Sequence, residues 1–193
     1  MSLNATYITE DTAGRGAELG FPRVSTCVAV VIRLPTELVG WHVTTSTLAT
    51  INSDKSSAQG AAKFLEYAGA AAVTDSLLVV GHVGNHNPVA LRDWIYAKLD
   101  IVLPTRAFDI TAHSKAKVGG EYHIFFSHRG GADPVISFKK SAKSTEANIG
   151  NGDPNMPRDL GSGLDRGYLP IHNRTADFSV KNLHSLRKHF VNL

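Results

Sequence analysis

The chain has 193 residues, of which 42% are hydrophobic and 19% are charged, so it is long enough to bury a core and is not a disordered charged chain. Its single cysteine excludes an intramolecular disulfide and any cysteine-rich zinc or iron–sulfur site. The 20 basic and 17 acidic residues give a net charge of +3 without a clustered basic stripe, which argues against nucleic-acid binding. The sequence has no run of 18 or more apolar residues, and we expect no membrane insertion.

The first 20 residues are polar and are expected to form an N-terminal arm without firm structure. They include Glu10 and Asp11 and no apolar segment of the kind found in secretory signal peptides, so we expect no Sec-dependent export. The lone thiol favours a reducing compartment.

Two short apolar segments after the arm predict a β-hairpin. Residues 27–32 form a β-branched run that is typical of a buried strand. Residues 38–45 also have strand composition, and Pro35 lies in the short connection between the two segments. A connection of this length favours an antiparallel pair.

Helices and strands alternate after the hairpin. Alanines at helical spacing predict a helix over residues 56–72, and residues 76–80 predict a further buried strand. A second helix is expected to begin with Asn87 as its N-cap and Pro88 as its first residue. Its apolar stripe consists of Leu91, Trp94, Ile95 and Leu99. Further short strands are expected at residues 101–103, 107–111, 122–127 and 135–138, with a turn at residues 129–134.

These elements predict one domain over residues 21–140. Its fold class is α/β, with mixed, largely antiparallel β-sheets packed with two main helices. Residues 141–170 are rich in Gly, Asn, Asp, Ser and Pro and are expected to form a polar linker. Helical spacing returns in residues 177–193, and we expect this C-terminal helix and the linker before it to pack on the same domain.

The hairpin brings Cys27 and His42 into one region of the molecule. If its turn is centred on Pro35 and Thr36, the numbers of opposed residues sum to 71, and Cys27 faces Thr44. His42 is then the diagonal neighbour on the same face, roughly 7–8 Å away at the backbone. A sum of 73 also keeps the two side chains on one face, whereas a sum of 72 puts them on opposite faces.

A cysteine beside a histidine has a characteristic chemistry. The imidazole stabilises the thiolate and carries its proton, so the sulfur attacks an acyl or amide carbon and forms a thioester. This chemistry needs no cofactor and no metal. The spacing also fits a structural interpretation, in which Cys27 is a small buried hydrophobe and His42 a hydrogen-bonded strand residue.

The residues around this pair resemble the CheD family of chemoreceptor glutamine deamidases. Residues 25–30, Ser-Thr-Cys-Val-Ala-Val, are similar to the family's Gly-Ser-Cys-Val-Ala-Val strand, and the His of Gly-Trp-His at residues 40–42 matches the one that ends the family's next strand. Residues 84–89 resemble the family's Gly-Glu-Arg-Asn-Val helix start. The paired glycines at 119–120 precede a strand, as paired glycines do in the family. The likeness covers about residues 19–140.

The resemblance implies a fold and an activity. The fold is the layered α/β sandwich of this family, which toxin domains of the cytotoxic necrotizing factor type share. The implied reaction converts a protein glutamine to glutamate and ammonia, with Cys27 as the nucleophile and His42 as the general base, and transamidation is a side reaction. The implied partner is a protein with a reactive glutamine, either a bacterial regulatory protein or the target of a toxin or effector. The implied location is the bacterial cytoplasm, or export or injection without a signal peptide.

Three departures separate this sequence from the family pattern. The Gly-Ser before the family's cysteine is Ser25-Thr26 here, and the threonine often found six positions before it is Phe21, whose ring does not orient an imidazole. A main-chain carbonyl near Phe21 or Pro22, or the Ser25 hydroxyl, is the candidate replacement. The spacing from cysteine to histidine is shorter than in the chemoreceptor enzymes and nearer that of the toxin domains.

Other functions and other site residues fit the same sequence. A protein-binding module that has lost activity, and a different Cys/His acyl-transfer enzyme such as a peptidase, are the alternatives. Candidates for a third catalytic group are Asp75, Asp93 and Asp109, for which solvated or capping roles are the default. His82 and His86 have a metal-ligand spacing, but the glycines around them favour loop residues or substrate-rim residues. Substrate selection is expected in the loops at residues 81–87 and 129–134.

Overall fold

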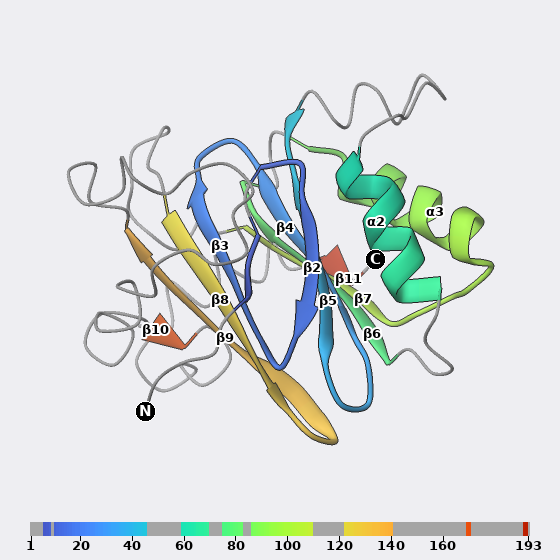
Figure 1. Cartoon of the computed structure of the whole chain (residues 1–193). Coiled ribbons are helices and arrows are strands. Elements are labelled where there is room, and N and C mark those ends of the chain that lie inside the picture. The colour runs from blue at the N-terminus through green and yellow to red at the C-terminus, as the bar shows by residue number, and fades with distance from the viewer. Residues whose placement is uncertain are drawn as a thin grey trace.

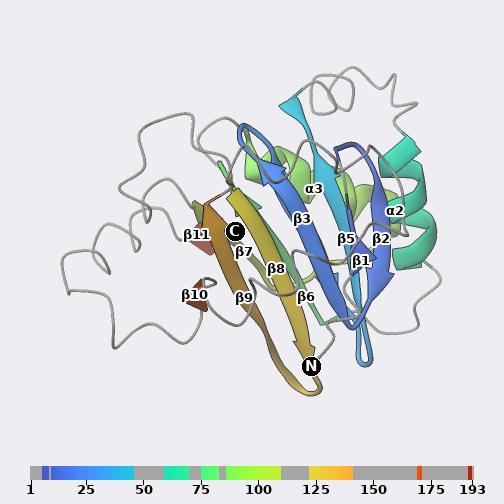
Figure 2. The ribbon, with the colours of Figure 1, turned by 60° about the vertical axis from the view of Figure 1, so that its left-hand side comes forward.

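Two β-sheets face each other, and two helices cover the outer face of one of them (Figures 1 and 2). The structure is a computed structural model, and it describes residues 6–8, 10–45, 59–69, 75–82, 86–109, 122–140, 169–170 and 191–192. In chain order the elements are β1 (Thr6–Tyr7), β2 (Ala13–Gly16), β3 (Glu18–Val24), β4 (Val28–Arg33), β5 (Leu38–Val43), α2 (Gln59–Gly69), β6 (Ser76–Gly81), α3 (Pro88–Leu99), β7 (Thr105–Asp109), β8 (Tyr122–Arg129), β9 (Ala132–Lys140), β10 (Leu169–Pro170) and β11 (Val191–Asn192).

The sheets are mixed but largely antiparallel. One has five strands in the order β1-β3-β8-β9-β10, and the other has six in the order β11-β7-β6-β4-β5-β2. The β1–β3 and β6–β7 pairs are parallel, and the other described pairs are antiparallel. The expected fold class is therefore confirmed: an α/β fold of mixed, mostly antiparallel sheets packed with two helices.

Strand β4 lies in the middle of the fold and is buried on both faces. Ala29 and Val31 point into the core between the sheets, whereas Val28, Val30 and Ile32 point toward the helices. A strand covered on both sides favours a continuous run of β-branched residues, because neither face meets water. This explains why the segment was recognisable as a buried strand.

The two helices follow the expected pattern where the structure describes them. The side chain of Asn87 accepts a hydrogen bond from the Ala90 N–H at 3.1 Å and caps α3, with Pro88 as its first residue. Leu91 and Ile95 are fully buried against the six-stranded sheet. Within the described residues, neither helix combines the length and apolar character that crossing a membrane requires.

The N-terminal residues differ from the expected unstructured arm. Among residues 6–20, the structure describes β1, β2 and the first part of β3. Strand β1 pairs with β3 in one sheet and β2 pairs with β5 in the other, so this segment connects both sheets. The polar composition of this segment did not predict these strands. An edge strand is held by backbone hydrogen bonds, and one side chain in two faces solvent, so it needs no apolar run.

The C-terminal expectations fall mostly outside the described residues. Within the expected linker and helix, the structure describes Leu169–Pro170, which pairs with β9, and Val191–Asn192, which pairs with β7. The helix prediction is thus wrong at residues 191–192, where pairing with a sheet edge decides the conformation and the spacing of apolar residues does not. Residues 101–103, which were expected to form a strand, connect α3 to β7 without one.

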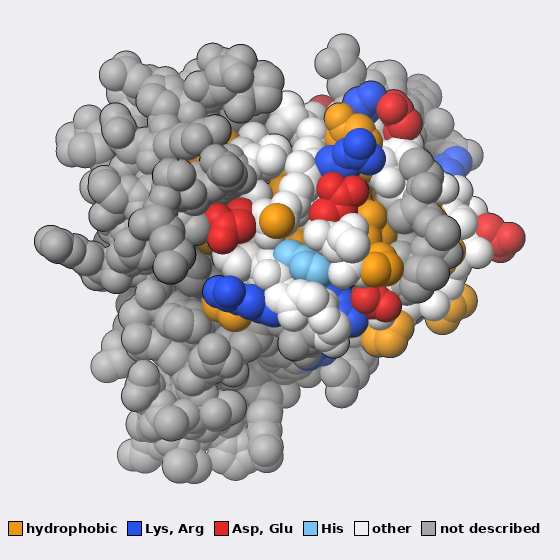
Figure 3. Space-filling view, turned by 60° about the horizontal axis from the view of Figure 1, so that its bottom comes forward, with side chains coloured by type: hydrophobic (Ala, Val, Ile, Leu, Met, Phe, Trp, Pro, Cys, Tyr) orange, Lys and Arg blue, Asp and Glu red, His pale blue; other side chains and the backbone are white. Residues whose placement is uncertain are grey.

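The end of the fold with the β4–β5 turn carries charges of both signs. Arg33 forms an ion pair with Asp75 at 3.0 Å, and Arg15 lies 3.9 Å from Glu37. On this face acidic, basic and hydrophobic side chains alternate over short distances (Figure 3). Such partly exposed pairs contribute little to stability, so this end is an ordinary solvated surface.

Candidate functional site

The register of the β4–β5 hairpin decides whether Cys27 and His42 share a face. Val28 lies opposite Val43 and Ala29 lies opposite His42, so the numbers of opposed residues sum to 71. This is the register that makes His42 the diagonal neighbour of Cys27. Cys27 and Ala29 belong to the core between the two sheets, and the His42 ring meets Phe21 in the same space. The sole thiol and the imidazole therefore point into one region, at the end of the hairpin away from its turn.

His42 is held as one defined tautomer. Its ring Nδ1 lies 3.0 Å from the carbonyl oxygen of Ile8, and since a carbonyl only accepts, Nδ1 carries the proton. Nε2 then has a lone pair, and this nitrogen is buried without a hydrogen-bond partner in the described part of the chain. A neutral imidazole with a free Nε2 lone pair is the form that a general base requires.

The backbone of His42 is fixed by the same N-terminal segment. Its carbonyl accepts a hydrogen bond from the Asp11 N–H at 2.9 Å, and its N–H donates to the Thr12 carbonyl at 3.0 Å. The Ile8 N–H donates to the Gly20 carbonyl at 2.7 Å, which ties the segment to β3. The imidazole is thus oriented by residues expected to form an unstructured arm, and Ile8 is the part of the candidate site that the sequence did not indicate.

Phe21 packs against His42 and forms an apolar wall of the site. Its ring meets the His42 ring edge-on, with 6.0 Å between centroids. Gly40 makes this packing possible, because a Cβ there would lie 2.7 Å from both the Phe21 ring and the Ile8 side chain. The group that binds Nδ1 of His42 is the Ile8 carbonyl, and not a carbonyl near Phe21 or Pro22 or the Ser25 hydroxyl.

Cys27 is almost completely buried, with 3% of its surface exposed. Burial is the main cause that raises the pKa of its thiol to about 11, and the charge of Glu10 raises it further. Hydrogen bonds from the Thr26 hydroxyl and from the N–H groups of Thr26 and Ser25 act in the opposite direction, because they favour the thiolate. In this state the thiol is protonated at neutral pH.

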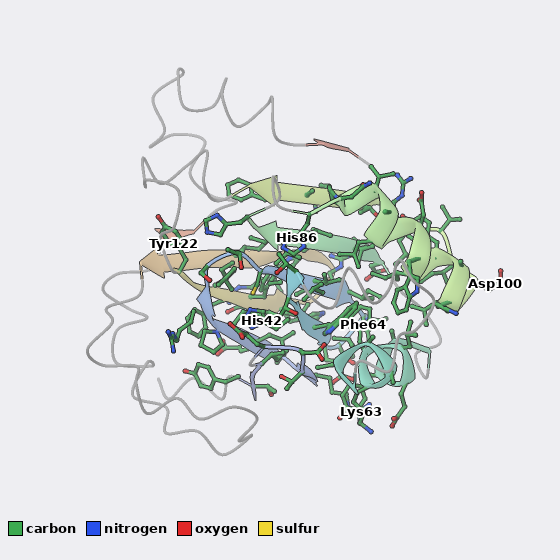
Figure 4. All side chains as sticks on the ribbon, turned by 90° about the horizontal axis from the view of Figure 1, so that it is seen from above. His42, Lys63, Phe64, His86, Asp100 and Tyr122 are labelled. Carbon is green, nitrogen blue, oxygen red and sulfur yellow. The ribbon has the colours of Figure 1, made fainter. Side chains whose placement is uncertain are left out.

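The segment after β6 holds the backbone on both sides of the thiol. The N–H of His82 donates to the Cys27 carbonyl at 3.2 Å, and Nε2 of His86 lies 2.5 Å from the Thr26 carbonyl. Both histidines are buried, so they line the inside of the site and are not rim residues. Figure 4 looks down on this end of the fold, with His42 and His86 in the middle of the view. Among the described residues, no group of three or more potential ligands is placed to bind a metal.

The aspartates considered as a third catalytic group lie elsewhere or are not described. Asp75 pairs with Arg33 at the far end of β4, and Asp93 pairs with Arg92 on the outer surface of α3. The side chain of Asp109 lies outside the described residues. The turn at residues 129–134 is also at the far end, since His128 before it donates to the carbonyl of Leu34 at 2.8 Å. The turn expected to take part in substrate selection therefore lies away from Cys27.

Acid is expected to destabilise the protein through His42. Burial lowers the pKa of this imidazole from 6.5 to about 4, so between these values the unfolded chain binds a proton that the folded chain excludes. The free energy of unfolding should therefore fall as the pH falls from about 6.5 to about 4, by up to about 3 kcal/mol from this group. Urea unfolding across this range measures it. His42→Asn should show a shallower dependence, and an identical slope would contradict the assignment.

Neither a protein-family model nor a curated protein matches this sequence. The function is therefore inferred from the chemistry of the site. That chemistry consists of a sole thiol, an imidazole with a free lone pair on the same face, and a carbonyl that fixes the imidazole tautomer.

Proposed function

We propose that the protein is a cysteine-dependent protein glutamine deamidase of the CheD-like superfamily. Cys27 is the nucleophile and His42 the general base. The observation that carries the proposal is the orientation of His42: its Nδ1–H is bound to Ile8, and its buried Nε2 has no partner among the described residues. A buried nitrogen without a partner costs about 1–3 kcal/mol, and a role as proton acceptor gives the Nε2 lone pair a function on the face that carries the thiol.

The reaction proceeds through a thioester. Nε2 of His42 takes the thiol proton while the sulfur attacks the carboxamide carbon of a glutamine side chain. The same imidazole then gives this proton to the departing nitrogen, so ammonia leaves and the acyl group stays on sulfur. A water molecule, deprotonated by Nε2, attacks the thioester and releases glutamate and the thiol. An amine in place of water gives the transamidation product.

In this mechanism, the proton moves from the Cys27 thiol to His42 during the attack of the sulfur on the substrate, and not before it. The pKa of the Cys27 thiol is raised to about 11 and that of His42 is lowered to about 4, both chiefly by burial. Both groups are therefore neutral at neutral pH, and the site holds no preformed thiolate–imidazolium pair. The thiol therefore loses its proton as the sulfur bonds to the substrate carbon. The site must also open to admit the substrate, since Cys27 is 3% exposed.

The burial of Cys27 favours a second candidate function, a protein-binding module that has lost the activity. In that case the thiol is a core hydrophobe, as is common for a buried cysteine. The two candidates differ in one result only, which is whether the chain converts glutamine to glutamate.

Mass spectrometry tests the proposal directly. We expect the protein to make a chemoreceptor cytoplasmic domain, casein or a blocked glutamine dipeptide heavier by about one dalton per glutamine converted, with release of ammonia. Cys27→Ser is the matched control and should convert none of them. Equal ammonia release by both proteins would show that the dyad is not catalytic. Cleavage of the casein backbone without deamidation would instead identify a peptidase.

A further inference from the structure

His86 contacts the backbone next to the nucleophile from a distant part of the chain. Its Nε2 lies 2.5 Å from the carbonyl oxygen of Thr26, a residue 60 positions earlier. The acceptor is a carbonyl, so Nε2 is the donor and carries the ring proton. His86 is 8% exposed, and its other nitrogen, Nδ1, is buried with no partner in the described residues.

The position of His86 is fixed by the start of a helix. It directly precedes Asn87, which caps α3 and also accepts a backbone hydrogen bond from Leu91 at 3.1 Å. On its other side, His82 binds the Cys27 carbonyl. The imidazole therefore reaches the Thr26 carbonyl from the residue that precedes the cap of α3.

Thr26 directly precedes Cys27, and its polar groups act on the thiol. Its hydroxyl and its N–H, together with the N–H of Ser25, lower the pKa of the Cys27 thiol by hydrogen bonding. Donors of this kind favour the thiolate over the thiol. A residue that holds Thr26 in place therefore acts on the nucleophile without touching it.

We propose that His86 is a positioning residue, which holds the Thr26 carbonyl and thereby keeps the donors of Thr26 directed at the Cys27 sulfur. The proposal rests on the proposed function only in that it gives Cys27 the role of nucleophile. The negative charge that develops on sulfur during the attack is stabilised by these donors, so losing the anchor slows formation of the thiolate.

The charges of the surrounding ionisable groups do not account for the effect that we propose for His86 on the Cys27 thiol. In the described part of the chain, the charge of Glu10 acts on the thiol, His42 of β5 lies on the same face as Cys27, and His82 and His86 bind the carbonyls of Cys27 and Thr26. Burial lowers the pKa of His86, and the charge of His82 lowers it further, so the ring is neutral at and above neutral pH. His86 thus acts through its hydrogen bond and not through a charge.

Two amides that differ by one methylene group test the role of the donor. Glutamine places its amide nitrogen where Nε2 of the imidazole lies, whereas asparagine is too short to reach Thr26. The measurement is the rate of alkylation of Cys27 by iodoacetamide from about pH 7 to about pH 11, followed by intact mass, which is unambiguous because the chain has one cysteine. We expect His86→Gln to keep the wild-type profile. His86→Asn should react about tenfold more slowly below the thiol pKa, a shift of about one pH unit.

Coincident profiles for the two His86 variants would overturn the proposal. If His86→Asn does not fold, Thr26→Val tests the proposal instead. Thr26 is exposed, and of the groups that lower the thiol pKa its hydroxyl has the largest effect. We expect Thr26→Val to shift the profile in the same direction, and an unchanged profile would equally overturn the proposal. Alkylation needs no turnover, so these outcomes are independent of whether the wild-type protein deamidates glutamine.

Discussion

Replacing His42 with asparagine is expected to lower the rate of glutamine deamidation by about 100- to 10,000-fold, the usual contribution of a general base. The asparagine amide nitrogen takes the place of the imidazole Nδ1, so the hydrogen bond to the Ile8 carbonyl is kept. The variant loses only the Nε2 lone pair, which has no structural partner to lose among the described residues. Its fold should therefore persist while its base is gone.

The measurement is kcat/KM for ammonia release, with circular dichroism and urea unfolding to verify the fold. His128→Gln is the matched control, because the glutamine amide keeps the hydrogen bond to Leu34 at the opposite end of the molecule. We expect it to retain wild-type activity. A His42→Asn variant that is folded and fully active would show that His42 is a structural residue and would remove the general base from the proposed mechanism.

The sequence was sufficient to predict the central hairpin and the side chains that it brings together. The run of apolar residues from Val28 to Ile32 indicates a strand buried on both faces. The short connection at Pro35 restricts the register to a few choices, and the observed one places His42 diagonal to Cys27. The strands and their register depend on residues close together in the sequence, so the pattern of apolar residues and turn residues predicts them.

The groups that complete the site come from distant segments and act mainly through the backbone. Ile8 orients His42 with a carbonyl oxygen, which every residue type has, so no side-chain pattern marks it. His86 reaches Thr26 only because α3 begins where it does. Its spacing from His82 suggested a metal site or a loop, and the hydrogen bond to a residue 60 positions away has no signal in the sequence.

Gly81 is the glycine on which the position of the nucleophile most depends. It lies at the end of β6 with a φ of +153°, opposite Val28 of β4. A Cβ at this position would lie 2.5 Å from the Cys27 carbonyl oxygen and 2.8 Å from the Val28 Cα. Both are backbone atoms, one of Cys27 itself and one of the first residue of β4, so they cannot move aside as the end of a flexible side chain can.

Gly81→Ala is therefore expected to destabilise the fold by about 1–3 kcal/mol and also to displace Cys27 from its hydrogen-bond donors. Urea unfolding gives the first effect, and the rates of iodoacetamide alkylation and of ammonia release give the second.

Gly130→Ala is the control that separates the loss of stability from the displacement of Cys27. At φ +58° it strains the backbone of the β8–β9 turn by about 1–2 kcal/mol, but its Cβ meets no atom within 4 Å and lies far from the thiol. We expect Gly130→Ala to lose stability while its thiol reacts as in the wild type. If Gly81→Ala behaves in the same way, the close contact of β6 with the Cys27 carbonyl supports the fold and does not position the nucleophile.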